Sequence, residues 1–355
     1  MPHPAPVLDS DFAPLMAWLK TRRPSRIALV MDPNTERGCL PHLVSVLPDD
    51  VDFLCLSEEG EAVKSLDNAN ALWQALDNAG YDRNSVLIGL GGGTVTDLTG
   101  FVASTFMRGI DFWLIPTTLL SMVDAAIGGK TGINLQSGKN RVGTFAFPSG
   151  VSLNPDFLAT LPTRHLRAGL AEHIKHILLT GDEARVQSAL QAAADALQSE
   201  SPASFGPIIE ESAAIKMDIV AQDERERSGH RKLLNLGHTA GHALESWALK
   251  EGHDLLHGEA VSWGLRFALH LSADRLGNEG PAAQSLLSLA DALKQLLPCP
   301  VAPPPAEILW EWAVRDKKNR GRDVLLVLLE APGKPLIDER VRFPEFERGV
   351  AMASN

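Results

Sequence analysis

Histidine is concentrated in one part of this chain. Nine of its 11 histidines fall between His165 and His270, and two of them, His238 and His242 in the string GHTAGH, lie four residues apart. On a helix this spacing places both imidazoles on one face, where a metal ion or a substrate could bind both of them. The distribution therefore indicates a site for imidazole chemistry in the second half of the chain.

Two further residues could complete a metal site. His257 follows a short glycine-containing loop in the string LLHGEAV. Glu172, in GLAEHIKH, stands among apolar positions of an expected helix, where a carboxylate without a partner would be costly to bury. One carboxylate and two imidazoles suit zinc or cobalt, with one coordination position left for a substrate. His173, His176 and His230 are harder to rank as ligands.

A group of glycines ends an expected strand and begins an expected helix. In the string IGLGGGT, the residues Gly91, Gly92 and Gly93 would leave backbone amides at the positive end of a helix dipole. Such a turn can bind the phosphates of a dinucleotide. The string is not GxGxxG, so a plain tight turn is the competing interpretation.

Basic residues stand beside glycines or beside the candidate metal ligands. They are Lys130 in GGKTG, Lys139 in SGKN, Lys175 after Glu172, Arg231 before LLNLGH, and the pair Lys317 and Lys318. This placement is more typical of phosphate and carboxylate recognition than of scattered surface lysines. It indicates an anionic substrate.

The composition is that of a globular protein and narrows the choice of partners. The chain has 355 residues, 45% of them hydrophobic and 22% charged, and its formal net charge is −11. Nucleic acid and anionic membranes are therefore poor partners, and an anionic substrate must be bound by a local group of Lys and Arg. Cys39, Cys55 and Cys299 have no CxxC spacing, which fits a reducing cytoplasm. The N-terminal residues lack a signal pattern, so we expect an unexported cytoplasmic protein.

The elements that must position these groups differ between the two halves. Strands and helices alternate in the first part, which predicts a parallel sheet covered on both faces. The expected strands are residues 25–31, 51–56, 85–90 and 111–115, with a helix over 68–79. Helical periodicity dominates afterwards, with helices expected over 164–179, 183–197, 207–221 and 238–249.

These patterns predict two domains. Residues 1–163 should form an α/β domain with a Rossmann-like parallel sheet, which could bind a dinucleotide, and the string LPT should mark its end. Residues 164–355 should form a mainly α-helical domain that binds metal and substrate. Five prolines within residues 298–305 should make a rigid connection before a last helix that contains Trp310 and Trp312.

The motifs taken together resemble the 3-dehydroquinate synthase family, a group of sugar-phosphate cyclases. The resemblance extends from about Asp32 to about Asn319, which is most of the chain. Its most specific strings are GGGTVTDLTGF, IPTTLLSMVDAAIGGKTGIN, SGKNRVGTF, AGLAEHIKH, RKLLNLGHTAGHALE and LLHGEAV. Matches in this number and order are hard to obtain by chance.

The resemblance implies roles for individual residues. Glu172, His238 and His257 match the family's metal ligands, whereas His242 matches a residue that contacts the substrate. The positions that match NAD contacts are Asp32, Asn34, Glu61, Lys64, Gly92, Gly93, Asp97, Thr117, Thr118, Asp124 and Lys139. The positions that match substrate contacts are Lys130, Asn140, Lys175, Lys216, Arg231, Asn235 and one of Lys317 and Lys318. Arg108, in FMRG, matches an arginine that reaches the phosphate site of a neighbouring subunit, which implies a homodimer.

The resemblance also implies an activity, that of a carbon–oxygen lyase of the shikimate pathway of aromatic amino acid biosynthesis. Its substrate is 3-deoxy-arabino-heptulosonate 7-phosphate, and its products are 3-dehydroquinate and phosphate. Transient oxidation by NAD allows phosphate elimination, and re-reduction, ring opening and aldol closure follow, so NAD is recycled. The chain departs from the family pattern at His173, His176 and His230, and the segment from Lys216 to Arg231 is one residue longer.

Three other functions compete with this one. A related cyclase that acts on sedoheptulose 7-phosphate would not need the carboxylate receptor that Lys216 and Arg231 offer. A metal-dependent polyol or alcohol dehydrogenase would release NADH and would need no lysine cluster for phosphate. An NAD-binding pseudoenzyme that serves as an interaction module would not need all three candidate metal ligands.

Overall fold

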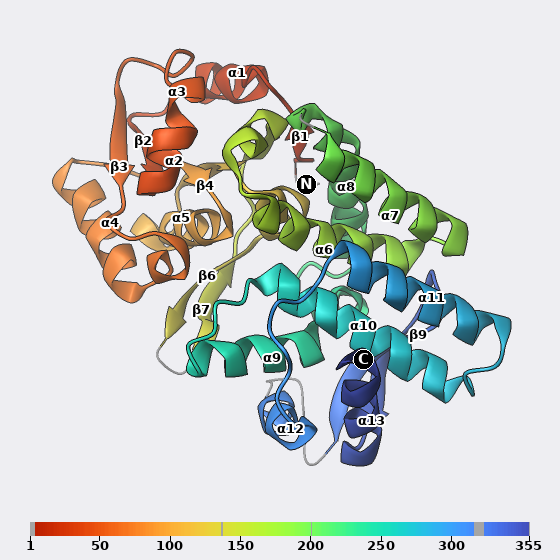
Figure 1. Ribbon diagram of the computed structural model, residues 1–355. Helices are drawn as coiled ribbons and strands as arrows, with labels where there is room; N and C mark the ends of the chain where they lie inside the picture. The colour runs from red at the N-terminus through yellow and green to blue at the C-terminus, as the bar shows by residue number, and fades with distance from the viewer. Residues whose placement is uncertain (1–3, 136–137, 200, 316–322, 355) are drawn as a thin grey trace. The chain divides into compact units, whose positions relative to one another are not determined.

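The computed structural model describes residues 4–135, 138–199, 201–315 and 323–354 (Figure 1). The chain forms two compact units. The first comprises Met1–Pro162 and Ser201–Met217, and the second comprises Thr163–Glu200 and Asp218–Asn355. None of the described helices combines the length and the apolar character that a membrane crossing requires.

The first unit is built on a six-stranded sheet. The hydrogen-bonded order is β1-β8-β5-β4-β2-β3, and all pairings are parallel. The strands are β1 (Val7–Leu8), β2 (Ile27–Met31), β3 (Val51–Cys55), β4 (Val86–Gly91), β5 (Asp111–Pro116) and β8 (Gly150–Leu153). All residues of β2, β4 and β8 are buried, as expected for strands covered on both faces. The predicted parallel sheet is confirmed.

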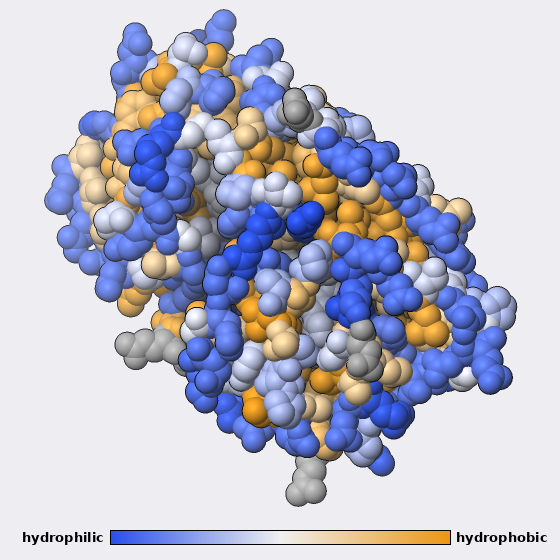
Figure 2. Space-filling view, viewed as in Figure 1, coloured by the Kyte–Doolittle hydropathy of each residue, from blue (hydrophilic) through white to orange (hydrophobic). Residues whose placement is uncertain are grey.

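Helices make most of the connections between these strands. The helices are α1 (Ala13–Arg22), α2 (Pro33–Gly38), α3 (Leu40–Leu43), α4 (Leu66–Asn78) and α5 (Gly93–Thr105), with the short turns η1 (Gly60–Val63), η2 (Phe106–Arg108), η3 (Ser121–Ala125), η4 (Pro155–Thr160) and η5 (Pro202–Phe205). The sequence did not predict the antiparallel hairpin of β6 (Lys130–Leu135) and β7 (Gly138–Phe145). Hydrophilic side chains cover most of the face drawn in Figure 2, in keeping with the charged composition.

The segment Ser201–Met217 belongs to the first unit, although the sequence placed it in the second domain. Phe205 in η5 is buried, and η5 packs on η4. Lys216, on α8 (Gly206–Gln222), forms an ion pair with Asp124 in η3. These long-range contacts return the chain to the sheet unit after the break at Pro162, so one boundary in the sequence does not describe the division.

The second unit is mainly helical, as predicted. Its helices are α6 (Thr163–Thr180), α7 (Glu183–Gln198), η6 (His230–Asn235), α9 (His238–Lys250), α10 (His257–Arg275), α11 (Pro281–Leu296), α12 (Ala306–Val314) and α13 (Phe343–Ser354). The antiparallel pair β9 (Val324–Ala331) and β10 (Lys334–Val341) was not predicted. The prediction that the helix with Trp310 and Trp312 is the last one was wrong, because α13 follows the β9–β10 hairpin.

Helix α10 is the centre of the second unit. It packs on α6, α9, α11 and α13, and it is buried on nearly all sides from Gly258 to Ala273 (Figure 1). Glycine permits several of these close approaches, and Gly264 is one example. A Cβ at Gly264 would lie 1.9 Å from the carbonyl oxygen of Gly237, the residue before α9, where φ is 76°. The backbones of α10 and of the start of α9 therefore touch directly.

We expect Gly264→Ala to destabilise the protein, because its new Cβ would overlap the Gly237 carbonyl oxygen. An added methyl group in a packed core typically costs about 1 to 3 kcal/mol, so thermal unfolding followed by circular dichroism should occur at a lower temperature. Gly38→Ala is the control, since its Cβ would lie 3.4 Å from Thr160 Oγ1, which is an ordinary contact. Equal unfolding temperatures for Gly264→Ala and the wild type would contradict this account of the helix packing.

Candidate functional site

Three side chains from three helices converge in the second unit. Oε1 of Glu172, on α6, lies 3.3 Å from Nε2 of His238 on α9 and 3.4 Å from Nε2 of His257 on α10. Ligand atoms placed tetrahedrally at about 2.0 to 2.1 Å from a metal ion are about 3.3 to 3.4 Å apart. The two separations from Oε1 of Glu172 are therefore those expected between ligands of a zinc-type ion.

The other ring nitrogen of each imidazole is already hydrogen-bonded. Nδ1 of His238 lies 3.1 Å from the carbonyl oxygen of Leu236, and Nδ1 of His257 lies 3.2 Å from Oε2 of Glu245. A carbonyl and a carboxylate accept hydrogen bonds, so Nδ1 is the donor in both rings, and Nε2 faces Glu172, where it can bind a metal in place of a proton. The sequence analysis missed Glu245. Its only signal was its position on the helix of His238, two turns further on.

The electrostatics of this cluster favour a cation. Burial alone would raise the pKa of the Glu172 carboxyl, but the charge of Lys175 and the imidazole of His238 hold that pKa well below its usual range. Burial alone would lower the pKa of His257, but Glu245 and Glu172 raise it to about 10. Burial holds the pKa of His238 below its ordinary value. The carboxylates thus attract positive charge to the place where the Nε2 atoms meet, and a divalent ion can supply it.

His242 belongs to the same cluster. It lies one turn after His238 on α9, and one ring nitrogen of each of His238, His242 and His257 lies within 4.8 Å of the other two. The four-residue spacing therefore brings both imidazoles of GHTAGH to one place. Geometry by itself leaves His242 able to contact either a metal or a substrate.

The other unusual histidines lie on α6 and η6. His173 and His176 are buried beside Glu172 on α6, and His230 is half-buried at the start of η6. Burial, reinforced by the charges of His176 and Arg185, lowers the pKa of His173 to about 3. His173 is therefore a neutral core residue near neutral pH.

One carboxylate organises the loop before Arg231. Asp223 accepts four backbone N–H groups at 2.7 to 3.2 Å, from Arg227, Ser228, Gly229 and Arg231. Nη1 of the buried Arg231 donates to the carbonyl oxygen of Glu224 at 2.7 Å. The guanidinium is thus held by a loop that is itself tied down. The sequence analysis missed Asp223, whose only signal was its position near Arg231. Asn235 ends the following turn, η6, and is half-buried there.

In the first unit, the predicted NAD positions begin at the ends of β2 and β4. Here the strand order reverses, because β3 lies on one side of β2 and β4 on the other. Ligands bind at such points in open parallel sheets. Asp32 follows β2 and caps α2 through the N–H of Thr35 at 2.8 Å.

The glycine turn leaves the start of α5 open. Gly91 ends β4, and Gly92 is the N-cap of α5, with no side-chain hydrogen bond to the first turn of the helix. Gly93 has little room for a side chain, since a Cβ there would lie 3.0 Å from Cβ of Ala125. The first N–H groups of α5 are therefore available for a phosphate, and these residues fit a dinucleotide.

Four predicted residues form two ion pairs in this unit, and a fifth, Asn140, accepts a hydrogen bond from one of them. Nζ of Lys64 lies 2.5 Å from Oδ2 of Asp97 and also contacts Oδ1 of Asn140. Nζ of Lys139 lies 3.2 Å from Oε2 of Glu61. Burial raises the pKa of the Asp97 carboxyl, although the charge of Lys64 opposes this rise. The contacts tie the β6–β7 hairpin to the segment around η1 and to α5.

Asp124 and Lys216, which the sequence assigned to different ligands, contact each other. Nζ of Lys216 lies 2.8 Å from Oδ1 of Asp124 and 2.5 Å from its carbonyl oxygen. Lys216 is 6% exposed, so this pair is largely shielded from water.

The remaining predicted residues lie in turns and at the ends of elements. Thr117 and Thr118 follow β5, and the N–H of Thr117 donates to the carbonyl oxygen of Gly91 at 3.0 Å. Asn34 and Lys130 are exposed, on α2 and at the start of β6, and Arg108 is exposed after α5 with a φ of 70°. Lys317 and Lys318 lie outside the described residues.

The sequence matches two family models. The 3-dehydroquinate synthase N-terminal model matches residues 54–168, and the C-terminal model matches residues 169–319. The 3-dehydroquinate synthase of Latilactobacillus sakei subsp. sakei is 44% identical over 283 residues, which cover 78% of this chain and 74% of the relative. The one from Pyrococcus abyssi is 37% identical over 326 residues, which cover 91% of this chain and 92% of the relative.

Solved structures share the fold. A 2-epi-5-epi-valiolone synthase from Streptomyces hygroscopicus subsp. jinggangensis, with NAD+ and Zn2+ bound, is 26% identical with a TM-score of 0.81, and the match covers 99% of this chain and 96% of that one. Butanol dehydrogenase A from Thermotoga maritima is 13% identical with a TM-score of 0.71, over 100% of this chain and 97% of that one. The fold is thus common to cyclases and dehydrogenases, and the sequence decides between them. Because the family models and the relatives cover most of its length, the chain belongs to the 3-dehydroquinate synthase family.

Proposed function

We propose that this protein is a 3-dehydroquinate synthase, which converts 3-deoxy-arabino-heptulosonate 7-phosphate into 3-dehydroquinate and phosphate in the shikimate pathway. The observation that carries the proposal is the convergence of Glu172, His238 and His257, in a chain whose relatives of that name span most of its length. The structural relative that holds NAD+ and Zn2+ supports the same pair of cofactors here.

We assign one divalent metal, zinc or cobalt, to Glu172, His238 and His257. When bound, the metal supplies a Lewis acid for a substrate oxygen, and NAD supplies a reversible hydride acceptor. Lys175 forms an ion pair with Glu172, so it keeps that carboxylate ionised and adds a hydrogen-bond donor. His242 offers a further imidazole at the same place, and we assign it to a substrate hydroxyl.

We assign NAD to the first unit. The open start of α5 at Gly91, Gly92 and Gly93 suits the pyrophosphate, because its amides lie at the positive end of the helix dipole. The other positions assigned to NAD are Asp32, Asn34, Glu61, Lys64, Asp97, Thr117, Thr118, Asp124 and Lys139.

The substrate is an anion with a carboxylate and a phosphate, and we assign cationic and amide side chains to it. Arg231 offers paired donors for the carboxylate, and Lys216 offers a point charge. The other residues assigned to the substrate are Lys130, Asn140, Lys175, Asn235 and one of Lys317 and Lys318. The tight loop that Asp223 organises supports the assignment of Arg231, since it holds the guanidinium before a substrate arrives.

We also propose a cytoplasmic homodimer in which Arg108 reaches the phosphate site of the neighbouring subunit. Met107 and Arg108 are exposed and have φ values of 48° and 70°. Backbone conformations of this kind persist where the surrounding structure stabilises them, and a contact with a second subunit would do so. Cys39, Cys55 and Cys299 are all free thiols, which suits a reducing compartment.

Removal of the metal should abolish activity, and added zinc or cobalt should restore it. His257→Ala should also lower the metal content, because it removes one of three ligands. Metal analysis of the purified variants measures this, with His253→Ala, which changes an exposed histidine of the same loop, as the control. Full activity without metal, or an unchanged metal content in His257→Ala, would remove the assignment. Unchanged content in His238→Ala alone would place His242 on the metal.

NAD should act as a recycled cofactor. With excess heptulosonate phosphate, one equivalent of NAD per site should support many turnovers, because each cycle returns the hydride to the substrate. Phosphate release and NADH absorbance should be followed together in one reaction. NADH that accumulates in proportion to product would identify a dehydrogenase instead.

Arg231→Ala should lower kcat/KM for the heptulosonate phosphate about ten- to hundredfold, because charged hydrogen bonds contribute roughly 1.5 to 3 kcal/mol each. Its metal content and NAD affinity should stay near normal. Arg231→Lys, which keeps the charge but loses the paired donors, should show an intermediate loss. Arg227→Ala is the matched control, because Arg227 is an exposed arginine of the same loop.

The wild type should release little phosphate from sedoheptulose 7-phosphate, which lacks the carboxylate. A preference for that sugar, or normal activity of Arg231→Ala on the acid, would overturn the choice of substrate and leave the cyclase class standing.

A further inference from the structure

One group of ion pairs joins two of the helices that carry the proposed metal ligands. Arg164, in the first turn of α6, meets Glu259, in the first turn of α10, through Nε–Oε1 at 2.6 Å and Nη2–Oε2 at 2.8 Å. The same guanidinium donates to Oδ2 of Asp254 at 2.5 Å and to its carbonyl oxygen at 2.8 Å. Arg164, Asp254 and Glu259 are called the clamp below. Paired contacts of this kind fix direction as well as distance.

The clamp also sets the start of α10. Oε2 of Glu259 accepts the N–H of Leu256, the residue before His257, at 2.8 Å. The carbonyl oxygen of Asp254 and the N–H of Leu256 are therefore both held by clamp side chains. His257 is the first residue of a helix whose preceding loop is fixed at two points.

The backbones of α6 and α10 touch next to His257. A Cβ at Gly258 would lie 2.0 Å from the carbonyl oxygen of Ala168, so no side chain separates the two helices. This close approach sets the distance between the two helices, and directional contacts further along them can help to fix their mutual rotation. Arg164 lies one turn before Ala168 and Glu172 lies one turn after it, so the clamp supplies a second point on the opposite side of the contact from the ligand.

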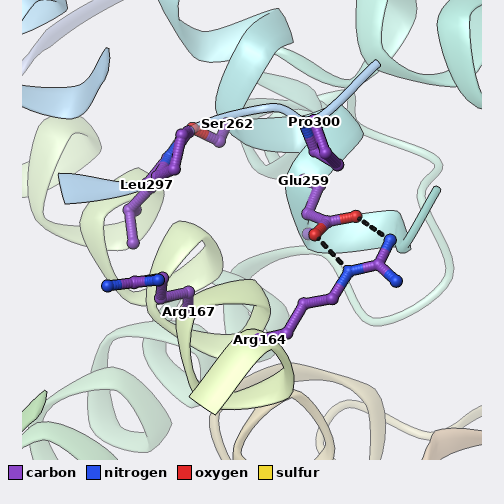
Figure 3. A pocket seen from close by; sticks show the side chains of 8 residues that line it. Arg164, Arg167, Glu259, Ser262, Leu297 and Pro300 are labelled. Atoms are coloured by element: carbon purple, nitrogen blue, oxygen red, sulfur yellow. Dashed lines mark hydrogen bonds and ion pairs between the residues drawn. The ribbon is translucent and has the colours of Figure 1, made fainter. Parts of the chain in front are cut away.

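The clamp lies beside a cavity, where the two helices are not in close apolar contact. Arg164 and Glu259 form part of the wall of a cavity of about 310 Å³, which Arg167, Ser262 and Leu297 also line (Figure 3). Figure 3 shows the Arg164 and Glu259 side chains pointing toward each other at one side of this cavity. At this side of the contact, the paired ionic contacts of Arg164 with Glu259 join the two helices, and such contacts are directional.

We propose that Arg164 and Glu259 are positioning residues for the metal site. They hold α6 and α10 so that Oε1 of Glu172 and Nε2 of His257 stay 3.4 Å apart. Neither of them contacts the ligand atoms, so they act through the helices. This inference rests on the proposed metal site and concerns the affinity of that site.

Arg164→Lys tests the proposal, because it keeps the charge and removes the paired geometry. We expect Zn2+ and Co2+ to bind the metal-free variant about tenfold more weakly or worse, the usual scale for residues that orient metal ligands. Competition with a chelator measures the affinity. The visible absorption of the Co2+-loaded protein, which reports the coordination geometry, should change as well. The unfolding temperature of the metal-free protein should change little, because partly exposed ion pairs add little to stability.

Arg167→Lys is the matched control. Arg167 lies one turn further along the same helix and lines the same cavity, but it forms no ion pair with any described residue. Its variant should bind metal like the wild type. The double variant Arg164→Ala, Glu259→Gln should lose no more affinity than Arg164→Ala does, because both changes break one pair.

Three results would overturn the proposal. The first is that Arg164→Lys and Arg164→Ala both keep the wild-type metal affinity and Co2+ absorption. The second is that Arg167→Lys loses as much metal affinity as Arg164→Lys does. The third is that metal affinity falls only in variants whose metal-free form is unfolded. A wild type that binds no metal at Glu172, His238 and His257 would instead overturn the proposed metal site, and the clamp with it.

Discussion

A carboxylate lies without exposed surface in the middle of α6, and the second unit is arranged around it. Glu172 belongs to a run from Ala168 to Leu179 in which every residue is buried. Transfer of a charged carboxylate out of water costs several kcal/mol unless opposite charge or hydrogen bonds surround it. Lys175 and the two imidazoles that meet Glu172 provide this compensation. Since the imidazoles come from α9 and α10, one side chain of α6 meets both of the other helices.

This requirement explains why glycine occurs where these helices meet. Three ligand atoms can approach to about 3.4 Å only if the backbones that carry them are also close. Gly258 brings α10 against Ala168 of α6, and Gly264 brings it against Gly237 before α9. Each contact lies near a proposed ligand in the sequence, so the glycines and the ligands form one arrangement. The glycines allow the helices to lie close together, and the proposed role of the clamp is to fix their mutual orientation.

In the first unit, the loops at the ends of the parallel strands carry the residues assigned to NAD. Its parallel sheet ends in loops, and the reversal of strand order beside β2 separates the loops after β2 and β4. Gly92 leaves the start of α5 without a side-chain cap, which suits an anion, and the ion pair of Lys64 and Asp97 braces the adjacent hairpin. Dehydrogenases share this fold, so the fold permits NAD chemistry in general and the individual side chains must select the reaction.

The sequence by itself determined the elements whose signals are local. The periodicity over 183–197 became α7 (Glu183–Gln198), and the apolar run over 85–90 became β4 (Val86–Gly91). The apolar run VLLVLLEA of β9 has no such signal, because its pattern suits a buried helix as well as a strand and only its partner β10 decides.

The same distinction applies to the site. Four-residue spacing predicted that His238 and His242 lie together, and they do, because one helix turn separates them. The hydrogen bond of Glu245 to His257 and the clamp of Arg164 with Glu259 join residues that are 12 and 95 positions apart. Only the tertiary structure decides such contacts, because the positions of separate helices depend on packing between surfaces and not on spacing along the chain.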